Sequence, residues 1–213
     1  MRQIKTALFD FDGVIVDTEP IYDIFWNEAS KRYGLGIENF ASHIKGTTLP
    51  YILEKYFSQH SEEFRQMVTR ESIEYEKKMP FPPMPGTIEF LHILKEQNVL
   101  IGLVTSSEDY KVERAFKELN LGNIFDTVVT ADRITRGKPD PTCYLLAAED
   151  LKVSPSDCIV FEDSFAGIEA GNRAGMRVVG LSTTNPEKSI QDKVYKVIPN
   201  FKNKTFEDYI SWC

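Results

Sequence analysis

The stretch Ala7–Asp17 constrains the fold of this chain more than any other, because it joins an apolar strand directly to two carboxylates. Residues 4–9 are short and largely apolar, which predicts a buried strand of a parallel sheet. Asp10 and Asp12 follow where such a strand opens into a loop, and Gly13 lets the backbone turn away. Ligands bind at that carboxyl edge in open α/β sheets. For the acidic pair taken alone, the alternative is a turn after an edge strand.

Two carboxylates at this edge can do two kinds of chemistry. One can attack an electrophile such as phosphorus to give an aspartyl phosphate, and either can bind a hard cation through oxygen. Asp10 and Asp12 stand at positions i and i+2, so they can converge on one ligand and divide these roles.

A helical block follows the first strand. The spacing of apolar residues predicts helices over 19–33, 49–57 and 61–79, with Ser61 as the N-cap of the last, and no strand pattern interrupts them. A proline-dense segment, 80–86, cannot continue a helix and is interpreted as a hinge.

The rest of the chain alternates strands and helices. Strands are expected at 99–104, 127–130, 158–161 and 177–181, helices at 87–97, 109–120, 141–151 and 164–174, then an edge strand at 195–198 and a helix at 205–211. This pattern predicts an α/β fold with a doubly wound parallel sheet. The core domain comprises residues 1–17 and 86–213, and an inserted α-helical cap comprises 18–85. Such an insertion can close over the site as a lid, or it can be a rigid subdomain.

Further polar residues follow other predicted strands. The Thr105 hydroxyl can donate to a phosphate oxygen, and backbone amides of Ser106 and Ser107 can add to it at the start of a helix. Lys138 lies in the turn Gly-Lys-Pro-Asp-Pro, which fixes the backbone around it. Its ammonium can neutralise Asp10 and a transferring phosphoryl group, or it can be a solvated lysine in a well-built turn.

A second acidic pair ends the strand at 158–161. Asp163, with Asp10 and the backbone carbonyl of Asp12, supplies the hard oxygen ligands that Mg²⁺ prefers. Glu162 is either a further ligand or a group that orients the others.

Charge narrows the class of ligand. The formal net charge of −7 and the absence of a dense Lys/Arg run exclude a nucleic-acid or anionic-membrane surface. The acids near Asp10 would repel a phosphorylated ligand, so a cation must intervene if phosphate is the substrate. With no signal or membrane-spanning pattern and three cysteines without metal-type spacing, we expect a cytoplasmic monomer with reduced thiols.

In this order, the motifs resemble those of the haloacid dehalogenase superfamily, in the branch with a helical cap inserted after the first motif, which includes phosphatases and β-phosphoglucomutases. The resemblance covers residues 4–182. It implies the following roles: Asp10 as nucleophile, Asp12 as general acid/base, Thr105 and Lys138 as phosphate-binding and charge-neutralising groups, and Asp163 with Glu162 at Mg²⁺. An aspartate at position 12 favours phosphate chemistry over dehalogenation, because an alkoxide leaving group needs a proton and a halide does not.

The cap departs from its relatives in two places. Tyr22 stands where they often carry a histidine. The loop Lys45-Gly46-Thr47-Thr48-Leu49 resembles the substrate-facing loop of the mutases, but Leu49 replaces the arginine that grips a distal phosphate. Tyr22, Lys45, Gly46 and Thr47 are therefore the cap's candidate substrate contacts, and Lys45 is the obvious local cation to replace that arginine.

The leading hypothesis is a Mg²⁺-dependent phosphatase that hydrolyses a small phosphorylated metabolite, such as a sugar phosphate, through an aspartyl phosphate. The alternative is a β-phosphoglucomutase-like enzyme, in which a sugar hydroxyl takes the phosphoryl group. A non-enzymatic receiver-like module that is phosphorylated on aspartate is a third class. The helical insertion and the paired acids count against it, because a receiver needs no lid.

Overall fold

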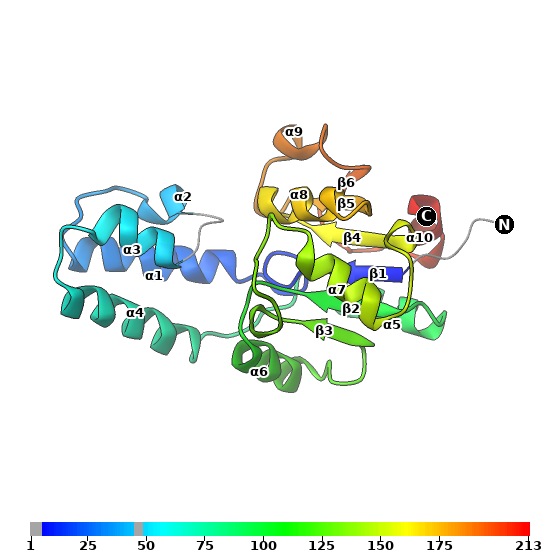
Figure 1. Ribbon diagram of the computed structural model, residues 1–213, viewed down its shortest axis with the longest axis horizontal. Coiled ribbons are helices and arrows are strands. Elements are labelled where there is room, and N and C mark those ends of the chain that lie inside the picture. Colours follow the sequence, from blue (N-terminus) through cyan, green and yellow to red (C-terminus); the bar gives the residue numbers. More distant parts are fainter. Residues whose placement is uncertain (1–5, 45–48) are drawn as a thin grey trace. The chain divides into compact units, whose positions relative to one another are not determined.

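The computed structural model describes residues 6–44 and 49–213, which form two compact units (Figure 1). One unit comprises the chain up to Asp17 together with Phe81–Cys213, and the other comprises Thr18–Pro80. The segment 81–85, which the sequence pattern placed with the helical block, is grouped with the larger unit.

The larger unit is built on one six-stranded parallel sheet, as the alternating pattern predicted. Its strands are β1 (Thr6–Phe9), β2 (Ile101–Val104), β3 (Thr127–Val129), β4 (Cys158–Glu162), β5 (Arg177–Leu181) and β6 (Lys196–Ile198). Their order across the sheet is β3-β2-β1-β4-β5-β6, with every pair parallel. Because β1 lies between β2 and β4, the loops that leave these three strands meet at one edge.

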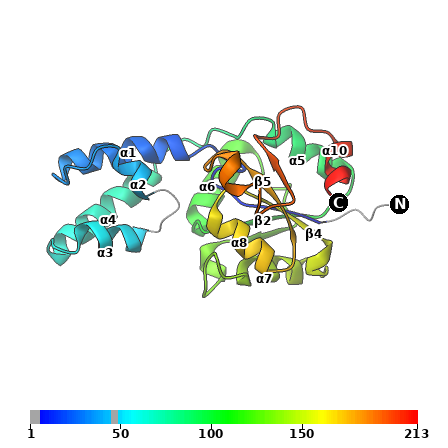
Figure 2. The same cartoon turned by 90° about the horizontal axis from the view of Figure 1, so that it is seen from above.

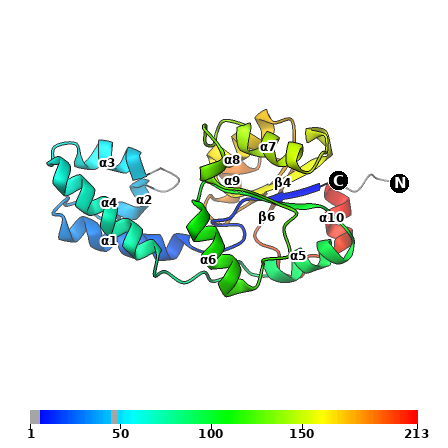
Figure 3. The same cartoon turned by 60° about the horizontal axis from the view of Figure 1, so that its bottom comes forward.

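Helices cover both faces of this sheet (Figures 2 and 3). On one face lie α7 (Thr142–Asp150) and α8 (Phe165–Arg173), and on the other lie α5 (Thr87–Glu96) and α10 (Phe206–Trp212). The unit also contains α6 (Asp109–Leu119), α9 (Glu187–Ile190) and the 3₁₀ turns Ala131–Arg133 and Pro155–Asp157. Side chains of successive strand residues alternate between the faces, so Leu8 and Val160 pack in the cluster with α7 and α8.

The opposite face is aromatic, and it fixes the two central strands against each other. Phe9 and Phe161 are register partners, and their rings stack with centroids 4.6 Å apart. Phe90 of α5 stacks on Phe201 at 4.9 Å, and Phe9 and Phe161 both contact this pair. Each such ring pair adds about 0.5–1.5 kcal/mol beyond its buried area. The packing thereby holds the ends of β1 and β4, and the acids that follow them, side by side.

The smaller unit contains α-helices and no strand in its described residues. It contains α1 (Glu19–Arg32), α2 (Phe40–Ile44), α3 (Leu49–Phe57) and α4 (Glu62–Glu76), around a core that includes Phe25, Phe40 and Phe57. Ser61 caps α4, since its hydroxyl oxygen accepts a bond from the Phe64 amide. In the two described ranges, no helix has the length and apolarity that a bilayer crossing requires.

The two segments that join the units to each other are paired within the larger unit. Val16 forms an antiparallel bridge with Pro83. On either side of this bridge, the Asp17 amide donates to the Pro82 carbonyl and the Met84 amide donates to the Ile15 carbonyl, each at 2.8 Å. These bonds satisfy backbone groups in a segment where prolines cannot donate.

Candidate active site

Lys138 links two acids at the carboxyl edge of the sheet. Its Nζ lies 2.5 Å from Asp10 Oδ1 and 2.6 Å from Glu162 Oε1, and it donates to the Val104 carbonyl at 3.1 Å. The Lys138 side chain is only 6% exposed. It is therefore not a solvated lysine, and it acts as the counter-charge of the two acids.

Glu162 is wholly buried, and both of its oxygens are engaged. Besides Lys138, the Tyr144 hydroxyl donates to Oε1 at 3.1 Å. The amides of Asp163 and Ser164, and the Ser164 hydroxyl, each donate to Oε2 at 3.0 Å. Gly167 makes room for this carboxylate, because a Cβ there would lie 1.6 Å from Oε1. The geometry is that of a group which orients Lys138 and the start of α8.

Asp163 is held by the loop after β5. The Thr184 hydroxyl donates to Asp163 Oδ2, and the side-chain Nδ2 of Asn185 donates to the backbone carbonyl of Asp163 at 2.9 Å. In the same loop, Thr183 donates to the Gly13 carbonyl at 2.7 Å. The loop thus connects the acid after β4 with the turn after β1.

Asp12 is bound by groups on the neighbouring loop and helix. Lys111 Nζ lies 2.7 and 2.8 Å from its two carboxylate oxygens, and the Ser107 hydroxyl donates to Oδ2 at 2.8 Å. Gly13 directly after it has φ +80°, which turns the chain away from the strand.

The loop after β2 is tied in place from both sides. The buried Thr105 donates its amide to the Val129 carbonyl at 2.8 Å, and its hydroxyl oxygen accepts a bond from the Ser107 amide at 2.9 Å. Ser106 is exposed in the same loop.

In the turn that follows Lys138, the Asp140 carboxylate accepts a hydrogen bond from the backbone amide of Thr142, the first residue of α7, at 3.0 Å.

The site carries more negative than positive charge. The pKa of the Asp10 carboxyl is raised from 3.8 to about 7, because burial and the nearby Glu162 carboxylate together raise it more than the Lys138 ammonium lowers it. Burial alone would lower the pKa of Lys138, but Asp10 and Glu162 raise it well above its usual value. Two buried carboxylates therefore share one ammonium, which leaves this cluster with a surplus of negative charge.

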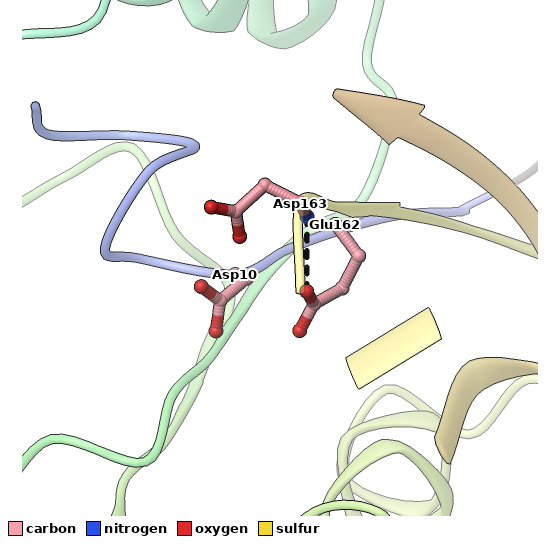
Figure 4. Close-up of side chains that lie close together, drawn as sticks. All are labelled: Asp10, Glu162 and Asp163. Carbon is pink, nitrogen blue, oxygen red and sulfur yellow. Dashed lines mark hydrogen bonds between the residues drawn. The ribbon is translucent and has the colours of Figure 1, made fainter. Parts of the chain in front are cut away.

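The donor set fits a hard divalent cation. Asp10, Glu162 and Asp163 are buried and each offers an oxygen within 4.8 Å of the others. Figure 4 shows that the side chains of Glu162 and Asp163 leave adjacent backbone positions in different directions, with the Asp10 carboxylate near both. Oxygen donors and uncompensated negative charge are what Mg²⁺ requires, and no softer donor is among the three.

Of the cap residues singled out in the sequence, some lie within the described residues and others do not. Tyr22 lies on α1 within the smaller unit, where its hydroxyl donates to Glu76 at 2.6 Å. Leu49 is the first residue of α3. Lys45, Gly46 and Thr47 lie outside the described residues.

Sequence reasoning missed four residues that contact the acids, Lys111, Tyr144, Thr184 and Asn185. Lys111 and Tyr144 lie within predicted helices, where helical periodicity alone does not distinguish a buried polar side chain from a solvated one. A usable signal for Thr184 and Asn185 was their position after a strand at the same sheet edge as Asp10.

The fold and the acid–lysine cluster together define an α/β enzyme with a buried aspartate at the centre of its site. The chain belongs to the haloacid dehalogenase-like hydrolases, whose family model matches residues 7–181. This match confirms the resemblance seen in the motifs.

Individual relatives act on phosphorylated sugars. The chain is 34% identical to the phosphorylated carbohydrates phosphatase of Thermotoga maritima over 84% of its length and 85% of the relative's. It is 30% identical to the β-phosphoglucomutase of Bacillus subtilis over 86% and 85%. A crystal structure of a haloacid dehalogenase family IA hydrolase from Entamoeba histolytica superposes with a TM-score of 0.85 at 27% identity, covering 98% of both chains. These relationships identify an enzyme of phosphoric monoesters, hydrolase or mutase, and not a receiver-like module.

Proposed function

We propose that this enzyme is a Mg²⁺-dependent phosphatase of a small phosphorylated metabolite, with a sugar phosphate as the substrate class. The observation that carries the proposal is the ion pair between Lys138 and Asp10 at the carboxyl edge of β1. A nearly buried ammonium fixes the orientation of that carboxylate and can also balance the charge of an incoming phosphoryl group. The phosphatase of Thermotoga maritima, named for phosphorylated carbohydrates, supports the substrate class.

Asp10 and Asp12 divide the chemistry between them. An Asp10 oxygen attacks phosphorus, the bond from phosphorus to the leaving oxygen breaks, and Asp12 gives that oxygen a proton. Asp12 then takes a proton from water as the water oxygen attacks the phosphorus of the aspartyl phosphate. The bond from phosphorus to Asp10 breaks, which regenerates the carboxylate and releases inorganic phosphate.

Asp10, Asp163 and the Asp12 carbonyl would hold the metal, which when bound supplies charge neutralisation and orientation for the phosphoryl oxygens. In this assignment Glu162 orients Lys138, since its oxygens already accept bonds from Lys138, Tyr144 and the turn at Ser164. Thr105, Ser106 and Ser107 are assigned to the phosphate by their place in the loop between the end of β2 and the start of α6.

The mutase is the second candidate because a β-phosphoglucomutase is among the relatives. A mutase must hold a second phosphate while the intermediate turns over, and Leu49 offers no charge for that purpose. One charge-assisted contact contributes about 1.5–3 kcal/mol, so its absence weakens binding of a bisphosphate measurably. Tyr22 and Lys45 remain the cap's assigned substrate contacts.

The deciding experiment is a phosphate-release screen over sugar phosphates, run beside a coupled mutase assay primed with glucose 1,6-bisphosphate. We expect net release of phosphate and little interconversion of β-glucose 1-phosphate and glucose 6-phosphate. Mutase turnover well above phosphate release would replace the phosphatase assignment with the mutase.

A further inference from the structure

The environment of Lys111 is not explained by the roles assigned so far. Its ammonium spans both oxygens of Asp12, at 2.7 and 2.8 Å. The Lys111 side chain is 4% exposed, whereas that of Asp12 is 26% exposed. The lysine is therefore enclosed, while the acid that it binds keeps an open side.

Helix stability does not account for a lysine at this position. Lys111 lies in the first turn of α6 (Asp109–Leu119), where the helix dipole favours negative charge and disfavours positive charge. An ammonium buried there without a counter-charge would also lose its hydration. The Asp12 carboxylate offsets both costs, so the placement of Lys111 depends on Asp12.

Hydrogen bonds hold in place the segment from which Ser107 and Lys111 contact Asp12. The Ser107 amide donates to Thr105 Oγ1 at 2.9 Å, and the Ser107 carbonyl accepts from the Ala131 amide at 3.0 Å. At the start of α6, the Thr130 hydroxyl donates to Asp109 at 2.6 Å. Two neighbouring strand ends thus brace the donors that reach Asp12.

We propose that Lys111, assisted by Ser107, is a positioning residue that holds the Asp12 side chain in the orientation from which its carboxyl proton reaches the leaving oxygen. The inference rests on the acid/base role assigned to Asp12. An aspartate side chain otherwise rotates between several χ1 wells and a broad χ2 range, and only a fraction of those orientations point at the leaving group. Proton transfer requires hydrogen-bond reach, so a small rotation reduces it steeply.

The test compares p-nitrophenyl phosphate, whose leaving group needs little protonation, with phenyl phosphate, whose leaving group needs more. The quantity compared between the two substrates is kcat/KM, because it reports the steps up to the first phosphorus–oxygen cleavage and excludes the attack of water on the intermediate. We expect Lys111→Met to widen the ratio of the two kcat/KM values by about tenfold or more. Lys111→Arg should restore part of the ratio, and Ser107→Ala should widen it less than Lys111→Met does.

Lys95→Met is the matched control, since Lys95 pairs with Asp126 at 2.7 Å on the surface of the same unit. Its ratio should equal that of the unaltered enzyme. Equal losses on both substrates in Lys111→Met would identify a purely structural ion pair and overturn the inference. Thermal melting checks that each variant folds, and if Lys111→Met does not, the ratios of Lys111→Arg and Ser107→Ala decide the question in the same way.

Asp12→Asn separates failure of this inference from failure of the proposed function. If Asp12→Asn leaves the ratio unchanged, the acid role of Asp12 is wrong. If Asp12→Asn widens the ratio but the Lys111 and Ser107 variants do not, only the positioning role is overturned. Combining Lys111→Met with Asp12→Asn should widen the ratio no further than Asp12→Asn alone, because both act on one proton transfer.

Discussion

Lys138, in the loop between β3 and α7, forms an ion pair of 2.6 Å with Glu162, the last residue of β4, and the two side chains are 6% and 0% exposed. The same ammonium binds Asp10 at 2.5 Å. One buried cation therefore joins the loop after β1, the loop after β3 and the end of β4, so we expect its loss to affect both the fold and the chemistry.

Removing that cation should destabilise the protein strongly. We expect Lys138→Met to lower the free energy of unfolding by about 3–5 kcal/mol, because two buried carboxylates lose their counter-charge. Urea unfolding measures this change in the free energy of unfolding. The control Lys95→Met breaks a partly exposed surface pair and should cost less than about 1 kcal/mol. Similar small losses in both variants would mean that the buried pair contributes no more than a surface one.

Asp10→Asn should abolish hydrolysis of p-nitrophenyl phosphate, since an amide is a far poorer nucleophile than a carboxylate. Mass spectrometry after acid quenching should find one added phosphoryl group in the unaltered enzyme during turnover and none in the variant. Substantial activity in a folded Asp10→Asn protein would remove Asp10 from the central role.

Mg²⁺ binding should respond differently to substitution of Glu162, the last residue of β4, and of Asp163, which follows it. We expect Asp163→Asn to abolish the binding detected by titration calorimetry, because it replaces a charged carboxylate ligand with a neutral amide. Glu162→Gln should weaken binding by about 10- to 100-fold without abolishing it, since Glu162 acts through Lys138 and the turn at Ser164. Equal loss of binding in both variants would make Glu162 a ligand.

Gly13→Ala should impair the same metal site by displacing Asp163. A Cβ at Gly13 would lie 2.0 Å from Asp163 Oδ2, and the backbone there has φ +80°. The strain of that backbone alone costs about 1–2 kcal/mol. Gly175→Ala is the control, because Gly175 has φ +74° and no atom of the described residues within 4 Å of the added carbon.

Gly13→Ala should therefore lose at least as much stability as Gly175→Ala, as followed by thermal melting, and only Gly13→Ala should require more Mg²⁺ for half-maximal phosphate release. A normal Mg²⁺ requirement in Gly13→Ala would mean that Asp163 can move aside without loss.

Most strands and long helices could be predicted because their apolar period matches their geometry over several residues. Two short helices could not. Phe40–Ile44 and Glu187–Ile190 are five and four residues long, too short to show a helical period. Strand β2 starts at Ile101 and not at Val99, because Asn98 adopts φ +56° and Leu100 is 40% exposed before the sheet begins.

The acids of the site could be predicted because each directly follows an apolar strand. Their partners could not, since pairing depends on distances across the fold. Asp12 and Lys111 are far apart in sequence, and only the parallel pairing of β1 with β2 brings their loops together. The number of donors to Glu162 likewise depends on Tyr144, which reaches it from inside α7.

The central place of β1 has a consequence for synthesis on the ribosome. Strand β1 is made first, but its partner Cys158–Glu162 emerges only after β2 and β3 have been made and can pair. Until then one edge of β1 has open backbone groups, which are a template for pairing with other chains. A chain stopped before residue 158 should therefore aggregate rather than accumulate as a folded core, whereas the helices of Thr18–Pro80 need no partner from the later part of the chain to form their contacts with each other.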